Sequence, residues 1–192
     1  YAQGYKTGNQ VRNSINLSGG TENALLTSSF SYFKQNGVIP FSDYRNITAK
    51  VGGQFKMGSM LKIRPSAYFI NSGGLRVNAD RYNESLTYWS PRWSVMDYKK
   101  PDGTMITYLA GNNNPVYGTY SNRYRDNVNR LIGDVAVTFS PFSFLDIDYK
   151  LGMDYYADFR KHAAAGPLGL AGEIPHEDNE LGFVNEYRIS NR

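Results

Sequence analysis

Four aspartates that could take part in catalysis or metal binding lie in one short stretch of this 192-residue chain, FLDIDYKLGMDYYADF at positions 144–159. They are Asp146, Asp148, Asp154 and Asp158, all of one parity in the numbering. In an extended strand, residues two apart share a face at a spacing of roughly 6.5–7 Å. That spacing suits a pair of acid–base carboxylates, such as a glycosidase uses, or a cluster that binds a metal ion.

The residues between these aspartates favour a different interpretation. The alternate positions are apolar, namely Leu145, Ile147, Tyr149, Leu151, Met153, Tyr155 and Phe159. Lys150 interrupts the acidic face, and Arg130 is expected on the neighbouring strand. The DID triplet also lacks the glycine and the distal glutamate of a calcium-binding loop. We therefore favour a strand in the wall of a larger structure, with one apolar face and one charged face that meets water, over a catalytic or metal site.

The same two-residue period recurs elsewhere, which predicts an all-β chain of antiparallel strands. The expected strands are 11–18, 23–34, 46–56, 61–70, 130–139 and 144–159, and a seventh begins near 182–189. No stretch shows a convincing helical stripe. Nine residues are expected on the charged face, which would line a lumen: Lys50, Lys62, Arg64, Arg130, Asp134, Asp146, Asp148, Lys150 and Asp154.

Short and long connections alternate along the chain. Tight turns are expected near 18–22, 57–60 and 140–143, and long loops near 35–45, 71–127 and 161–181. Antiparallel strands then place every short turn at one end and every long loop at the other, which is typical of an outer-membrane β-barrel. Six or seven strands cannot enclose a charged lumen, so the chain is expected to be an arc of a larger barrel. Arg192 is not the aromatic residue on which such barrels usually end, and both ends look cut.

Composition excludes several other classes. The chain is 41% hydrophobic and 15% aromatic, which argues against disorder, and it contains no cysteine for disulfides, thiolate metal sites or thiol nucleophiles. The net charge of +4 is spread along the chain, so no nucleic-acid partner is expected. No run of about 18 apolar residues predicts a membrane-spanning helix. His162 and His176 lie in one expected loop without the partners of a metal site, and no metal or cofactor is expected.

Ordered motifs resemble one family. They are SINLSGGTENALLTSSFSYFKQNGVIPFSDYRNITAKVGGQF (14–55), NPVY (114–117) and NVNRLIGDVAVTFSPFSFLDIDYKLGMDYY (127–156). Their order and spacing resemble the SusC/RagA group of TonB-dependent outer-membrane transporters of Bacteroidetes. The resemblance covers nearly all of 14–160, although no single motif would be sufficient.

This resemblance implies a barrel of about 22 strands with a plug domain absent from this chain. It also implies a non-enzymatic importer in the outer membrane of a Gram-negative cell. Such importers take up oligosaccharides or peptides, driven by TonB, and a SusD-like surface lipoprotein covers the extracellular mouth as a lid. The alternative that the residues leave open is a soluble β-sandwich that binds carbohydrate through an aromatic loop.

The long loop holds the candidate binding residues. Aromatic side chains are frequent between 82 and 124, and tyrosine and tryptophan serve sugar stacking, protein contacts and packing alike. The candidates for ligand or lid contact are Tyr88, Trp89, Trp93, Tyr117, Tyr120 and Arg123. Packing of the loop on itself, or an aromatic girdle at the lipid boundary, would explain the same residues.

Overall fold

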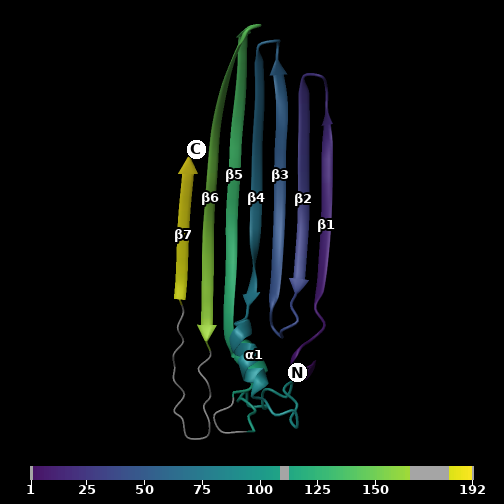
Figure 1. The fold of residues 1–192 in the computed structure, drawn as a ribbon, viewed down its shortest axis with the longest axis vertical. Coiled ribbons are helices and arrows are strands. Elements are labelled where there is room, and N and C mark those ends of the chain that lie inside the picture. Colours follow the sequence, from purple (N-terminus) through teal and green to yellow (C-terminus); the bar gives the residue numbers. More distant parts are fainter. Residues whose placement is uncertain (1, 109–112, 165–181, 192) are drawn as a thin grey trace.

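The computed structural model describes residues 2–108, 113–164 and 182–191. They form one seven-stranded sheet in which every strand pairs antiparallel with the next in the sequence (Figure 1). The strands are β1 (Asn9–Gly20), β2 (Ala24–Asn36), β3 (Asp43–Met57), β4 (Leu61–Arg76), β5 (Asn122–Phe142), β6 (Leu145–Ala164) and β7 (Gly182–Asn191). A short 3-10 helix, η1 (Ala2–Gly4), precedes them.

The sequence-based prediction of an antiparallel all-β chain is confirmed, but the strands are longer than expected. The β5 strand has 21 residues and β6 has 20. The pairing of β5 with β4 also includes a stretch in which polarity does not alternate, namely Tyr124, Arg125, Asp126 and Asn127. Backbone pairing can extend past the apolar band of a wall, where both faces are polar and the two-residue period disappears.

The turns are segregated as the sequence predicted. The connections after β1, β3 and β5 are tight and lie together at one end of the sheet, at the top of Figure 1. Gly58 adopts a φ of 67° in the β3–β4 turn, a conformation that glycine reaches without steric cost. The β2–β3 connection, the described part of the β4–β5 connection and the N-terminal segment lie at the opposite end, whereas most of the expected loop near 161–181 lies outside the described residues.

The sequence shows no convincing helical stripe, but the structure contains two short α-helices. The connection between β4 and β5 contains α1 (Ala79–Thr87) and α2 (Pro115–Ser121). Local capping explains both, because the side chains of Asn78 and Asn114 accept hydrogen bonds from the first turns and Pro115 occupies the start of α2. Helices this short show too little apolar periodicity to be detected. Within the described residues, no helix is long and apolar enough to cross a membrane.

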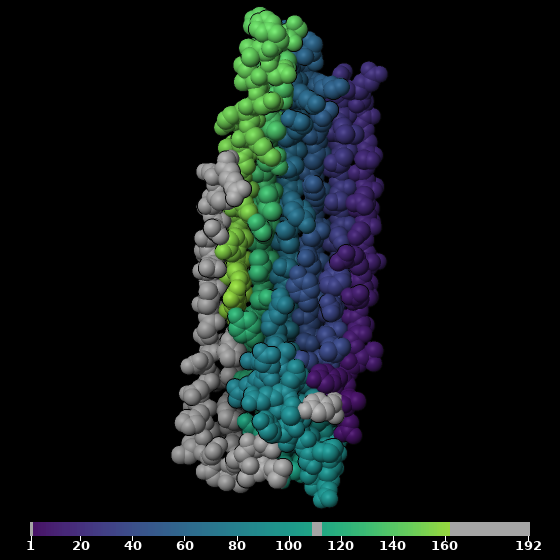
Figure 2. Space-filling view, viewed as in Figure 1, coloured from purple at the N-terminus to yellow at the C-terminus, as the bar shows by residue number. Residues whose placement is uncertain are grey.

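Most of the buried side chains lie in the long connections; the exceptions on the sheet are Ala157 and Asp158 of β6. Ile39, Tyr82, Leu86, Val95 and Val116 form an apolar core. We call the surrounding segments, residues 2–8, 37–42, 77–108 and 113–121, the cap. Figure 2 shows part of the cap, in teal, at the foot of the strands beside the N-terminal segment in purple. The described strands form one sheet with no second sheet packed against it, so the sandwich alternative does not describe this fold.

Candidate functional site

One face of the sheet is apolar across six strands. The pairing places Leu151 opposite Val135, and Val135 opposite Pro65. We call this side the apolar face; its larger members are Ile15, Leu17, Leu26, Phe30, Val51, Phe55, Ile63, Pro65, Phe69, Leu131, Val135, Val137, Phe139, Ile147, Tyr149, Leu151 and Met153. Many of them are exposed, with Leu17 at 66% and Leu151 at 55%. Exposure of this extent is expected only where something other than water covers the surface.

The height of the apolar face matches a lipid bilayer. On β6 the apolar positions run from Leu145 to Tyr155, ten residue steps or about 33 Å along the strand. At the tilt of about 40° that membrane barrels adopt, this spans about 25 Å, the height of the apolar band of such barrels. On the cap side of the apolar band, the same face becomes polar. There Asn71 Nδ2 donates to Asn129 Oδ1 at 2.7 Å and to Asn127 Oδ1 at 3.0 Å.

The opposite side, which we call the polar face, carries all nine residues that the sequence placed together. On β5 and β6 the carboxylates are already engaged. Asp148 accepts from Thr138 Oγ1 at 2.5 Å, and Asp146 accepts from Ser140 Oγ at 2.5 Å. Carboxylates that hydrogen-bond to the neighbouring strand form a cross-strand network, and this favours the wall interpretation over a free acid–base pair.

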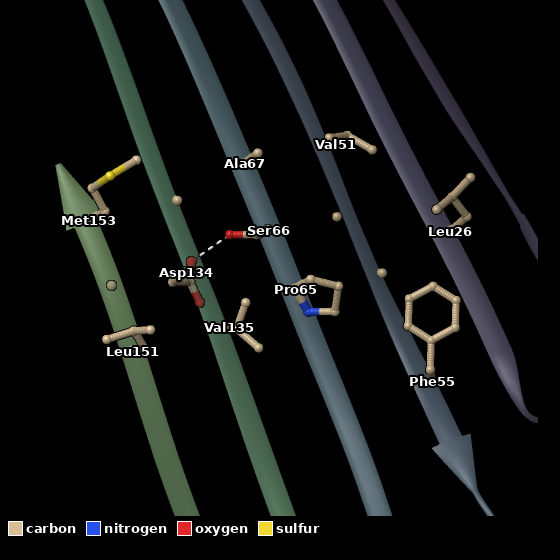
Figure 3. Close-up of a pocket in the computed structure, with 14 residues that line it drawn as sticks. Leu26, Val51, Phe55, Pro65, Ser66, Ala67, Asp134, Val135, Leu151 and Met153 are labelled. Carbon is tan, nitrogen blue, oxygen red and sulfur yellow. Dashed lines mark hydrogen bonds between the residues drawn. The ribbon is translucent and has the colours of Figure 1, made fainter. Parts of the chain in front are cut away.

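Two ion pairs extend this network. Arg130 Nε donates to Asp154 Oδ1 at 2.8 Å, and Lys150 Nζ lies 3.7 Å from Asp134 Oδ2. Asp134 also accepts from Ser66 of β4, the dashed line in Figure 3. These contacts join β4, β5 and β6 through side chains as well as through the backbone.

The cations of β3 and β4 are arranged differently. Lys56 and Lys62 lie directly opposite each other, and Lys50 is farther along β3 on the same face. Arg64 Nη2 donates weakly to Thr138 Oγ1 at 3.4 Å. The polar face therefore carries cations without carboxylates on β3 and β4, and cations paired with carboxylates on β5 and β6. Such a polar, charge-bearing face is what the lumen side of a water-filled barrel presents.

The aromatic candidates in the cap separate into buried and exposed groups. Tyr117 is 5% exposed, and Trp89 packs against the cap core. Trp93 stacks on Tyr108 with ring centroids 4.3 Å apart, and both remain about two-fifths exposed. Tyr88 is 67% exposed. Packing thus occupies some of these rings and leaves others available for contact.

Two cations contact the ring of Tyr120. Lys99 Nζ is 4.7 Å from the ring centroid of Tyr120, and Arg123 Cζ is 5.4 Å from it. The ring also contacts Phe41 and Tyr98. Tyr120 and Arg123 are therefore joined by a cation–π contact at the edge of the cap.

Asn114 is a residue that the sequence analysis missed as a determinant of the cap. It is fully buried, its Nδ2 donates to Val95 O at 3.0 Å, and its Oδ1 accepts from Val116 N at 2.9 Å. The Asn114-Pro115 pair could have signalled a helix start, but only the fold brings Val95 to the amide.

Tyr82 joins the N-terminal segment to α1. Its hydroxyl donates to Gly4 O, and Tyr5 Oη donates to Asn83 Oδ1 at 2.6 Å. Burial, with a smaller contribution from Tyr5, raises the pKa of Tyr82 to about 12. The cap is thus fastened to residues that precede β1.

The two histidines were expected in one loop. His162 falls within β6, and His176 lies outside the described residues. Within the described part of the chain, no three or more histidine or acidic side chains are grouped to hold a metal ion.

Comparisons with known proteins agree with this architecture. No family model matches the chain. The TonB-dependent receptor SusC of Bacteroides thetaiotaomicron is 24% identical over 208 residues, covering 97% of this chain and 19% of SusC. A solved structure described as the RagAB peptide importer in the 'closed-closed' state matches with a TM-score of 0.64 at 12% identity, over 91% of this chain and 20% of the other.

The chain spans about a fifth of the length of each protein that it matches. The sequence likeness extends over almost all of its residues, and the structural likeness gives its fold. The chain therefore resembles SusC in sequence and has the fold of a section of the wall of a TonB-dependent outer-membrane barrel.

Proposed function

We propose that this chain is a section of the barrel wall and extracellular loops of a TonB-dependent importer in the outer membrane of a Gram-negative bacterium. The apolar face contacts lipid and the polar face lines the lumen. The tight turns face the periplasm, and the cap lies on the extracellular side. The section has no catalytic role, because its function is to bound and guide the path of an imported oligosaccharide or peptide.

The observation that carries this proposal is the separation of the two faces over six strands. Leu151 and Lys150 are adjacent in sequence and lie on opposite faces of one strand. A water-soluble protein would cover the apolar face with a second layer, whereas a membrane barrel leaves it to lipid. The likeness to SusC and to the RagAB structure supports the same assignment.

The cap provides the surface for a partner. Exposed rings at Tyr88 and Trp93, together with Arg123 beside Tyr120, offer the aromatic and guanidinium groups that are frequent in protein interfaces. We assign this surface to contact with a SusD-like lipoprotein lid or with the cargo. Trp89 and Tyr117 support it from within the cap.

The test uses the full-length protein that contains this chain, expressed in its own outer membrane with an affinity tag. Purification is expected to recover a surface lipoprotein at near one-to-one ratio, and uptake of the cognate oligosaccharide or peptide should stop when TonB energisation is removed. Recovery of the protein in the soluble fraction, or uptake that persists without TonB, would contradict the proposal.

A further inference from the structure

Two cations face each other on the apolar face, just beyond the cap-side limit of the apolar band. Lys34 of β2 lies directly opposite Arg45 of β3. Lys34 has the parity of Phe30, and Arg45 has the parity of Val51, so both belong to the apolar face. Like charges in this arrangement repel each other and destabilise the pairing of two strands.

Within the described residues, neither cation has a side-chain hydrogen bond or an ion pair that would offset this repulsion. Both are exposed. The carboxylate on the same face of β3, Asp43, is engaged elsewhere, since its Oδ1 accepts from Leu75 N at 2.5 Å. The pair therefore presents two cations to whatever surrounds the sheet at this height.

That height corresponds to the headgroups of the outer leaflet. From Arg45 to Val51 there are six residue steps, about 20 Å along the strand and about 15 Å across a membrane at a tilt of about 40°. Half of a hydrocarbon core is also about 15 Å. A lipid with its headgroup at Lys34 and Arg45 would thus bring the ends of its chains to the level of Val51.

A depression of about 390 Å³ lies on the apolar face at that level (Figure 3). Its walls are formed by Leu26, Val51, Phe55, Pro65, Ala67, Val135, Leu151 and Met153. Gly53 and Gly133 contribute no side chain to it. A Cβ on Gly53 would come within 2.9 Å of the Phe55 ring, so Gly53 makes room for one wall of the depression.

Gly133 is not required by packing. A Cβ there would meet only Ser66 O, at 3.7 Å, which is ordinary contact. Glycine inside a strand destabilises it by about 0.5–1 kcal/mol relative to alanine. Gly133 therefore keeps a space open that a larger residue could fill without a backbone clash.

We propose that Lys34 and Arg45 bind the phosphate of an acylated lipid in the extracellular leaflet, and that the end of one of its chains occupies the depression. This inference rests on the proposed function, because it requires the apolar face to contact a membrane. The arginine fork and the lysine ammonium suit phosphate oxygens, and the depression presents mostly hydrocarbon to an occupant, with Ser66 and Asp134 also at its lining. The phosphate removes the repulsion between the two cations.

The test measures binding of lipid A, with and without its phosphate groups, to the full-length protein in nanodiscs of zwitterionic phospholipid. Wild type is expected to bind the phosphorylated form about tenfold or more tightly than the dephosphorylated form. The Lys34→Gln/Arg45→Gln variant should lose that preference. Lys50→Gln, a charge removal on the polar face of the same strand as Arg45, should retain it.

A second pair of variants tests the depression. Gly133→Leu fills it and should weaken binding of both lipid forms several-fold. Gly152→Leu is the matched control, because Gly152 also borders the depression and has ordinary room for a Cβ, but its place in the register directs that Cβ to the polar face, beside Asp134. Equal binding of the two lipid forms by wild type, or equal effects of the two leucine variants, would overturn the proposal.

Heat modifiability on gels distinguishes a failure of the proposed lipid site from a failure of the proposed function. If the wild-type protein is a folded barrel in the outer membrane but shows no phosphate preference, only the lipid site is wrong. If it is not in the outer membrane, the proposed function fails first, and the lipid site with it.

Discussion

Arg130 of β5 binds Asp154 of β6 diagonally, with Nε donating to Oδ1 at 2.8 Å, although the register places Ile132 opposite Asp154. The pair lies on the polar face, where Lys150 and Asp134 form a second diagonal contact. Of the four aspartates that first suggested acid–base chemistry, Asp146, Asp148 and Asp154 are bound to the adjacent strand, and Asp158 pairs with Arg160 of its own strand. The relationship favours a wall stabilised by side-chain pairs across the strands.

The first prediction concerns the energy of that pair. Arg130 and Asp154 keep 44% and 31% of their side chains exposed, so water screens their attraction. A double-mutant cycle with Arg130→Gln and Asp154→Asn should give a coupling below about 1 kcal/mol in the free energy of unfolding. Urea unfolding of the full-length protein in lipid vesicles measures it. A coupling of several kcal/mol would indicate a dry site rather than a hydrated lumen.

A substitution of Asn114 tests whether the cap is a cooperatively folded unit. Asn114→Ala removes the hydrogen bonds to Val95, Val116 and Tyr117 and leaves the Val95 carbonyl without its amide partner. Local opening of the cap should become easier by about 2–3 kcal/mol. Hydrogen exchange at the amides of Val116 and Tyr117 reports this change.

The neighbouring exposed residue provides the matched control for the cap. Asn113→Ala should leave exchange at both amides unchanged, because Asn113 is exposed. Equal exchange in the two variants would mean that the buried amide does not hold the cap together.

A pH dependence is predicted for Tyr82. Burial raises its pKa to about 12 from an ordinary value of 10, so the folded cap holds this proton more tightly than the unfolded chain. The resulting stabilisation is complete below pH 10 and is lost as pH rises from 10 to 12. The difference between wild type and Tyr82→Phe in absorbance near 295 nm should show one phenol that titrates near pH 12. Titration of that phenol at pH 10 would mean that Tyr82 is exposed.

Two adjacent glycines at the β1–β2 turn should differ in tolerance. A Cβ on Gly20 would lie 2.2 Å from Ala24 O, whereas a Cβ on Gly19 would meet nothing within 4 Å. Gly20→Ala should destabilise the hairpin by about 1–3 kcal/mol, and Gly19→Ala should not. The folded fraction of each variant after refolding into vesicles provides the comparison. Similar folded fractions would show that the turn is looser than the structure describes.

The strand pattern could be predicted from sequence because the environment on each side of a wall is uniform. Leu145 to Met153 alternate with Asp146 to Lys150 since one face meets hydrocarbon and the other meets water. The same logic explains why the register brought Lys62, Arg64 and Asp134 to one face. The strand ends were missed because that contrast disappears beyond the apolar band.

The cap could not be predicted in the same way. Its core joins Ile39 of the β2–β3 connection to Tyr82, Val95 and Val116 of the β4–β5 connection, and no local period links them. The pair Lys34 and Arg45 was also missed, because its significance depends on the register between β2 and β3. Contacts set by the pairing of distant segments leave little trace in the order of the residues.

The central claim is that the two faces of the sheet meet different solvents, and one labelling experiment tests it most directly. Single cysteines replace Lys150 and Leu151, neighbours on β6, in a cysteine-free form of the full-length protein in native outer membranes. A small water-soluble maleimide should label Lys150→Cys readily and leave Leu151→Cys largely unlabelled, until detergent exposes the latter. Equal labelling of both cysteines in intact membranes would contradict the account.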